Sequence, residues 1–171
     1  IGIVTSSSTA AFQDIISTVQ RRSPSSQVSL SEAIVQGDNA HVSIINALNR
    51  IVLFNEINPE NKIDVVILSR GGGSIEDLWC FNNEDLAREI FSFQIPTISG
   101  VGHEIDFTIC DFVSDIRVPT PTASAELVTE FNFRLQDKFN EFKLDIYKSI
   151  NRLFLYLNQK IEMNQSKLKS P

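Results

Sequence analysis

Two glycine-containing segments contain the side chains best suited to chemistry on a phosphate group. The first runs from Ser69 to Ser74 and follows the apolar run Ile63 to Leu68. The second runs from Gly100 to Asp106 and follows Ile95 to Ile98. When a strand leads directly into glycines, the backbone amides can face an anionic ligand, and a cationic or titratable neighbour completes the site. Two such segments in one small domain predict phosphate chemistry.

The first segment combines a guanidinium group with a run of glycines. Arg70 can clamp a phosphate while the neighbouring backbone amides approach the same oxygens. The predicted phosphate ligands are Gly71, Gly72, Gly73, Ser74 and, from a later segment, Arg117. The alternative is a flexible turn that carries a surface arginine. Trp79, which follows this segment, is expected to pack in the core and not to serve as a platform for stacked bases.

The second segment supplies His103, and histidine suits general acid or base catalysis because imidazole titrates near neutral pH. If a helix begins near Ile105, its first turn places Asp106 close to His103. The alternatives are that Asp106 only caps a helix and that His103 only makes a structural hydrogen bond to the backbone. The residues alone leave these alternatives open.

Asp14 and Arg117 are further candidates. Asp14 falls on the second turn of a predicted helix, where it can orient His103 or a water molecule. The alternative is that its negative charge only stabilises the amino end of the helix. Arg117 can pair with Asp115 or face the substrate. The predicted catalytic residues are therefore Asp14, Arg70, His103 and Asp106.

Metal and cofactor sites have weak support in this sequence. Asp14, His103 and Asp106 could bind a metal ion together, but no HExxH, cysteine-cluster or calcium-loop spacing accompanies them. No GxGxxG motif follows the first strand, and no P-loop lysine is present. We therefore predict no dedicated metal site and no required cofactor, and Mg²⁺ is left open as the alternative.

Apolar runs alternate with helical patterns over residues 1–122. Strands are predicted at Ile1–Thr5, around Val28 and Leu30, at Ile63–Leu68 and at Ile95–Ile98. Helices are predicted at Ala10–Arg22 and at Asn83–Phe93. Between them, a third helix is predicted from the apolar residues Val42, Ile45, Leu48, Val52 and Ile57. This alternation favours an α/β fold with a small parallel sheet of about four strands and flanking helices. Ligands of such sheets bind beyond the carboxyl ends of the strands, so both glycine segments and Asp14 are expected at one edge.

A different pattern begins near Ala123 and predicts a second domain at residues 123–171, a long projecting C-terminal helix. Its apolar residues recur in an 11-residue repeat, at Phe131, Leu135, Phe139, Phe142, Ile146, Ile150, Leu153, Leu157, Ile161 and Leu168. Thr122 or Ser124, with Glu126, is expected to open the helix. The stripe needs another helix as partner, either from a second copy or from another protein. The alternative is that the helix breaks and folds back onto the first domain.

The composition is that of a globular protein. The 171 residues are 42% hydrophobic, carry a net charge of −6 and include two cysteines, Cys80 and Cys110, which are expected to be buried and reduced. No apolar run suits a membrane span and no basic leader is seen, so we expect a cytoplasmic protein without membrane association. The acidic balance argues against strong nonspecific nucleic-acid binding. A start without Met and an end within a helical pattern predict a fragment of a longer chain.

Three stretches together resemble the exonuclease VII large subunit family. They are IGIVTSSSTAAFQDI, SRGGGSIEDLWCFNNEDLAR and IPTISGVGHEIDFTICDFVSDIRVPTPTASAE, and they lie within residues 1–126. The resemblance implies a nuclease that degrades single-stranded DNA from either end to short 5′-phosphorylated oligonucleotides. It implies catalytic roles for Asp14, Arg70, His103 and Asp106. It also implies a preceding OB-fold, a helical arm that binds several copies of a small helical subunit, and no strict need for metal.

Two other functions fit the same residues. A nucleotide- or cofactor-binding module also places polar loops at strand ends. A noncatalytic assembly scaffold would depend on the long helix, through which the chain could also self-associate. The nuclease hypothesis differs from both, because it alone requires Arg70 and His103 for turnover of single-stranded DNA.

Overall fold

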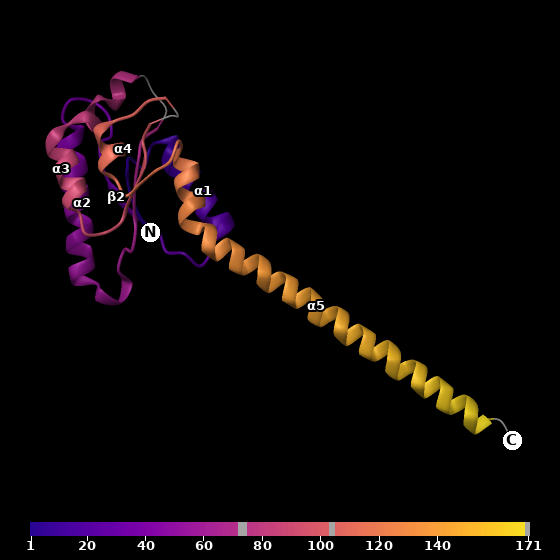
Figure 1. Ribbon diagram of the computed structural model, residues 1–171. Helices are drawn as coiled ribbons and strands as arrows, with labels where there is room; N and C mark the ends of the chain where they lie inside the picture. The colour runs from indigo at the N-terminus through magenta and orange to yellow at the C-terminus, as the bar shows by residue number, and fades with distance from the viewer. Residues whose placement is uncertain (72–74, 103–104, 170–171) are drawn as a thin grey trace. The chain divides into compact units, whose positions relative to one another are not determined.

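The computed structural model describes residues 1–71, 75–102 and 105–169. The chain divides into two units, Ile1–Glu130 and Phe131–Pro171. The first unit is an α/β domain and the described part of the second is helical (Figure 1). The α/β class that the alternation of strands and helices predicts is therefore confirmed.

Within the described residues, the first unit contains one sheet of five parallel strands in the order β2-β1-β3-β4-β5. The strands are β1 (Gly2–Thr5), β2 (Ser29–Glu32), β3 (Val66–Ser69), β4 (Thr97–Gly100) and β5 (Ile116–Arg117). The four predicted strands are present within a few residues of their expected positions. The sequence does not predict β5, because two residues are too short to show a period. This strand exists through its pairing with Ile98 and Ser99 of β4.

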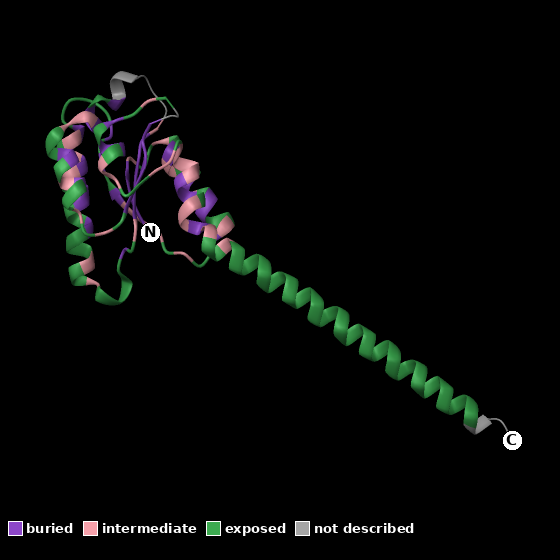
Figure 2. Ribbon diagram, viewed as in Figure 1, coloured by how far each residue is buried: buried purple, intermediate pink, exposed green. Residues whose placement is uncertain are grey.

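Helices cover both faces of the sheet (Figures 1 and 2). They are α1 (Ala10–Arg22), α2 (Ala40–Ile57), α3 (Glu84–Ser92), α4 (Ile109–Val113) and α5 (Pro121–Lys169), with 3₁₀ segments η1 (Pro59–Asn61) and η2 (Ile75–Asn82). One core lies under α1 and the start of α5 and contains Ile3, Ile67 and Ala125. The other lies under α2 and α3 and contains Val66 and Leu68. Alternate residues of a strand point to opposite faces, which is why β3 contributes to both cores.

Helix α1 has the bounds that the sequence predicts. It begins after Thr9 because the Oγ1 atom of Thr9 accepts a hydrogen bond from the backbone N–H of Phe12 at 3.3 Å, which satisfies one free donor of the first turn. Ile15 and Val19 lie one turn apart and are buried against the sheet. Thr9 therefore ends the loop after β1 and begins the helix that covers one face.

Helix α2 exists where its apolar pattern predicts a helix. Of the five apolar positions that define this pattern, Val42, Val52 and Ile57 are exposed, so they do not mark the buried face. The buried residues are instead Ala40, Ile44, Ala47, Leu48 and Ile51. Apolar residues occur around most of this helix, so the pattern does not define one face. The small side chain of Ala47 allows close approach to the sheet, where the Ser31 hydroxyl donates a hydrogen bond to the Ala47 carbonyl oxygen at 2.9 Å.

Helix α5 is one unbroken helix of 49 residues, which confirms the predicted long helix and excludes the predicted alternative of a break. It begins at Pro121 and not at the expected caps. The hydroxyl of Thr120 accepts a hydrogen bond from the backbone N–H of Ala123 at 3.0 Å. Ser124 lies inside the first turn, where its hydroxyl donates to the carbonyl oxygen of Pro121. Proline is suited to the first helical position because that N–H has no partner within the helix.

The second unit presents its apolar residues to solvent. Residues 134–167 are all exposed (Figure 2), including Ile146, Ile150 and Leu153 of the predicted stripe. Exposed apolar residues that repeat along one helix are typical of a surface that another helix covers. None of the helices in the described part of the chain combines the length and apolar content of a membrane span.

Cys80 and Cys110 are buried free thiols, as expected. Burial raises the pKa of the Cys110 thiol well above its ordinary range, and the nearby Asp111 carboxylate adds to this effect. Cys110 is therefore a neutral packing residue and not a nucleophile, since thiol chemistry requires the thiolate.

Candidate functional site

The order of the strands creates a switch point between β1 and β3. The chain leaves β1 through α1 on one face of the sheet, and it leaves β3 through η2 and α3, whose packing lies on the other face. Loops that diverge in this way open a crevice at the carboxyl ends of the strands, which is where ligands of open parallel sheets bind. The two loops meet there, because a Cβ atom built on Gly71 would lie 3.4 Å from Cβ of Thr9. Thr9 and Gly71 therefore mark the position of the candidate site.

Arg70 lies at this switch point, at the carboxyl end of β3. The residue is only 5% exposed, so it is not the surface arginine of the alternative interpretation. Guanidinium stays charged at all physiological pH values, which places a fixed positive charge beside Gly71. The preceding Ser69 is fully buried, and its Oγ atom has no hydrogen-bond partner among the described residues. Polar atoms of this kind are uncommon in protein interiors, and this one directly precedes Arg70 in the chain.

Glu32, at the end of β2, holds the loop between β1 and α1. Its two carboxylate oxygens accept hydrogen bonds from the backbone N–H of Ser7 at 3.0 and 3.1 Å, and one also accepts from the Ser7 hydroxyl at 3.2 Å. The hydrogen bond from the Ser7 backbone lowers the pKa of Glu32 below its ordinary value. A carboxylate thus already accepts hydrogen bonds from the Ser7 amide of the loop between β1 and α1. Its negative charge repels a phosphate from this part of the loop.

The pH dependence of Glu32 leads to a prediction about this loop. Because its pKa is lower in the folded chain, its contribution to stability is present above the ordinary value of 4.5 and is lost as pH falls through the lowered value. Glu32→Gln should therefore reduce stability near neutral pH by less than about 1 kcal/mol, since the carboxylate is exposed. The difference from wild type should shrink below pH 4. Denaturant unfolding of the full-length protein across this pH range measures it, with the exposed Glu56→Gln as control.

The loop between β4 and α4 is organised by Gly102 and Asp111. A Cβ atom on Gly102 would lie 2.0 Å from the carbonyl oxygen of Asp106, so only glycine fits under this turn. The buried Asp111 carboxylate accepts hydrogen bonds from the Ser99 hydroxyl at 2.5 Å, the Thr108 N–H at 2.8 Å and the Thr108 hydroxyl at 2.9 Å. Asp111 thereby ties the loop to β4.

The structure corrects the predicted start of this helix. Helix α4 begins at Ile109 and not near Ile105, because Thr108 and Asp111 form a reciprocal capping box. Asp106 is a half-buried loop residue before the helix. Asp111 has no predicted role, although the pattern Thr108-x-x-Asp111 is a signal of a capping box that identifies it.

Arg117 lies beside this loop, because its guanidinium carbon is 3.9 Å from the ring centroid of Phe107. The Asp115 carboxylate accepts hydrogen bonds from the backbone N–H and the hydroxyl of Thr97 at 2.7 and 3.1 Å. Arg117 is therefore next to the Asp106 loop, while its role toward a phosphate stays a prediction.

Of the predicted catalytic residues, Asp14, Arg70 and Asp106 lie among the described residues. Asp14 is exposed on α1, and no hydrogen bond or ion pair links its side chain to Arg70 or Asp106 in the described part of the chain. His103, Gly72, Gly73 and Ser74 lie outside the described residues. Within residues 1–71, 75–102 and 105–169, no group of three His, Cys, Asp or Glu side chains could hold a metal ion. The roles of all four predicted catalytic residues stay predictions.

Comparison with known proteins gives the family. The family model described as exonuclease VII, large subunit, matches residues 1–171. The chain belongs to the exonuclease VII large subunit family. Relatives named exodeoxyribonuclease 7 large subunit include one from Vibrio parahaemolyticus serotype O3:K6, 53% identical over 132 residues, which are 77% of this chain and 28% of that protein. One from Bacillus mycoides is 45% identical over 165 residues, 96% of this chain and 35% of that protein.

The resemblance to the exonuclease VII large subunit family that the three stretches carry is thus confirmed. The chain spans about a third of the length of the curated relatives that it matches. Within that third lie the switch point with Arg70, the Asp111-centred loop and the long helix α5.

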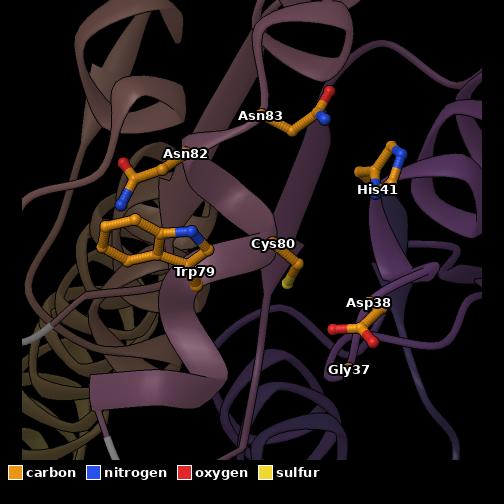
Figure 3. A pocket seen from close by; sticks show the side chains of 7 residues that line it. All are labelled: Gly37, Asp38, His41, Trp79, Cys80, Asn82 and Asn83. Atoms are coloured by element: carbon orange, nitrogen blue, oxygen red, sulfur yellow. The ribbon is translucent and has the colours of Figure 1, made fainter.

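The described part of the chain also has a pocket that the sequence did not predict (Figure 3). The pocket has a volume of about 260 Å³ and is lined by Gly37, Asp38, His41, Trp79, Cys80, Asn82 and Asn83. Trp79 is 76% exposed, so the prediction that it packs in the core is wrong. Leu78 and Phe81, beside it in η2, fill the core instead. Hydrophobicity alone does not distinguish these three positions.

Proposed function

We propose that this chain is the catalytic part of an exodeoxyribonuclease VII. The enzyme hydrolyses phosphodiester bonds of single-stranded DNA from both ends and releases short 5′-phosphorylated oligonucleotides. The observation that carries the proposal is the contact of the Arg70–Gly71 segment with Thr9 at the β1/β3 switch point. A buried cation beside a glycine loop at this edge suits a phosphodiester. The relatives' name, which specifies a DNA exonuclease, agrees with this chemistry.

In this proposal Arg70 and the amides of Gly71 to Gly73 bind the phosphoryl oxygens. Negative charge on these oxygens increases as water attacks phosphorus. Donors that are already oriented stabilise that charge without further reorganisation. The Glu32 carboxylate, which accepts hydrogen bonds from the Ser7 backbone N–H, discourages a phosphate from binding at that part of the loop between β1 and α1. Together the two groups favour one position for the scissile phosphate.

The proposed reaction is a direct hydrolysis. A 5′-phosphate product means that the oxygen of water bonds to phosphorus while the P–O3′ bond breaks. One proton leaves the attacking water and one proton reaches the leaving O3′ oxygen. His103 is the proposed group for one of these transfers, and Asp106 or Asp14 is proposed to orient its ring. We propose no required cofactor, and Mg²⁺ stays the alternative that chelation tests.

The proposed partner of the second unit is the exonuclease VII small subunit. The relatives are named as large subunits, and the second unit of this chain exposes an apolar stripe along α5. A helical partner would remove that stripe from water, which is the main driving force for such association. Self-association through the same stripe is the alternative. We place the assembled enzyme in the cytoplasm, where bacterial DNA is found.

A gel assay of labelled single-stranded DNA tests the proposal. Full-length large subunit assembled with the small subunit should shorten 5′-labelled and 3′-labelled strands to short oligonucleotides, with and without chelator, and should leave duplex DNA intact. His103→Ala should bind the strand but release little product. Saturable binding of a mononucleotide without any DNA degradation would instead support the nucleotide-binding alternative.

A further inference from the structure

We propose that the pocket between η2 and the amino end of α2 binds one nucleobase of the single-stranded DNA. This inference rests on the proposed nuclease function and adds to it a subsite for the substrate. The pocket volume of about 260 Å³ lies below the roughly 300 to 1,000 Å³ of most small-molecule sites. It is therefore suited to a single planar ring system and not to a whole dinucleotide.

Trp79 provides the surface on which a base can stack. Its side chain is 76% exposed although Leu78 and Phe81, on the same short helical segment, are 3% and 1% exposed. The two buried residues anchor η2 in the core, which fixes the backbone that carries Trp79. The indole lies beside Asn82, and Asp38 and His41 line the pocket across from η2 (Figure 3). An indole held in this way is a stacking platform that accepts any base, because every base has a π-face.

Asn82 and Asn83 provide hydrogen-bond donors at the same pocket. The Oδ1 atom of Asn82 accepts from the backbone N–H of Ile109 at 2.9 Å, and that of Asn83 accepts from the N–H of Leu86 at 3.1 Å. These bonds fix which way each amide is turned, since the carbonyl oxygen must face the backbone donor. Neither amide nitrogen has a hydrogen-bond partner within the described residues. Two NH₂ groups are thus available for ring nitrogens and carbonyl oxygens of a base.

Asp38 decides between a base and a phosphate as the occupant. Its side chain lines the pocket opposite η2, next to His41 (Figure 3). A carboxylate repels a phosphate, but it accepts hydrogen bonds from the N–H groups of a neutral base. Donors on Asn82 and Asn83 with an acceptor on Asp38 match the mixed edge of a nucleobase.

The pocket is joined to the loop that carries Asp106. Ile109, whose N–H binds Asn82, is the first residue of α4 and follows that loop directly. A strand with one base on Trp79 can therefore continue along the carboxyl edge of the sheet toward Arg70. In this arrangement Trp79 fixes the position of the strand and takes no part in bond cleavage.

The test compares Trp79→Ala with wild type in the full-length enzyme assembled with its small subunit. We expect the Kd for a short phosphorothioate oligothymidylate, and the KM for its cleavable counterpart, to rise about tenfold, with kcat nearly unchanged. Trp79→Phe should retain most of the affinity. Phe91→Ala, which removes an equally exposed aromatic of α3 outside the pocket, should have no effect. An oligonucleotide with abasic sites should bind wild type and Trp79→Ala equally.

Three results would overturn the proposal that Trp79 forms a nucleobase subsite. They are an unchanged Kd in Trp79→Ala, a loss of affinity that persists with the abasic strand, and dissociation of the assembly on size-exclusion chromatography. The last would mean that another part of the complex covers Trp79. The Kd measurement does not depend on cleavage. If wild type binds the strand through Trp79 but degrades no DNA, the proposed function fails while the base subsite stands.

Discussion

Replacing Arg70 by alanine in the full-length, assembled enzyme should lower kcat for single-stranded DNA by about 100-fold or more. Arg70 is 5% exposed at the carboxyl end of β3, beside the Gly71–Thr9 contact at the switch point. In the proposed mechanism, loss of the guanidinium removes a fixed charge that stabilises the phosphoryl oxygens in the transition state. Initial rates on a labelled strand, at substrate concentrations above KM, measure the effect.

Arg70→Lys is the matched control for this prediction. It retains the charge but loses the planar, bidentate geometry, so its kcat should lie between those of wild type and Arg70→Ala. Because Arg70 is buried, thermal unfolding of each variant must show that the fold is retained. A folded Arg70→Ala enzyme with kcat close to wild type would remove Arg70 from the mechanism. The scaffold alternative predicts that result, together with loss of cellular function when Ile146 and Ile150 are made polar.

Gly102→Ala adds a single methyl group and should disrupt both the fold and turnover more than Gly100→Ala does. The added Cβ would lie 2.0 Å from the carbonyl oxygen of Asp106, far inside van der Waals contact, and that atom belongs to the backbone and cannot rotate away. The backbone at Gly102 and the carbonyl group of Asp106 must therefore move apart. We expect a loss of about 1–3 kcal/mol in unfolding free energy. We also expect a fall of at least about tenfold in kcat, since small displacements of positioned groups are costly.

Gly100→Ala is the comparison for this second prediction. A Cβ atom there would lie 3.3 Å from the carbonyl oxygen of Thr120, a contact that a shift of a few tenths of an ångström relieves. Its effect on unfolding and on turnover should be clearly smaller. Gly102→Ala with wild-type Tm and kcat would show that the turn is not needed in this form. Thermal unfolding and steady-state rates of the two variants decide between these outcomes.

The fold could be predicted where the signal is local. Helix α1 has its predicted bounds because Thr9 is a cap and the apolar spacing is clear over four turns. The unbroken α5 follows from an uninterrupted repeat. The strand β5 and the buried face of α2 could not be predicted in this way. The first depends on pairing with β4, and the second on which side of an evenly apolar helix the sheet meets.

The candidate site also has features that the sequence predicts and features that it does not. The sequence by itself determined that Arg70 and Gly71 follow one strand and that Gly102 and Asp106 follow another, since strand and loop are neighbours along the chain. Only the tertiary structure decided that Gly71 meets Thr9, that Asp111 ties the second loop to Ser99, and that Trp79 faces solvent beside Asn82. Contacts of these kinds depend on the strand order and on how the residues of η2 divide between core and surface. Both result from packing the whole domain, which no local pattern records.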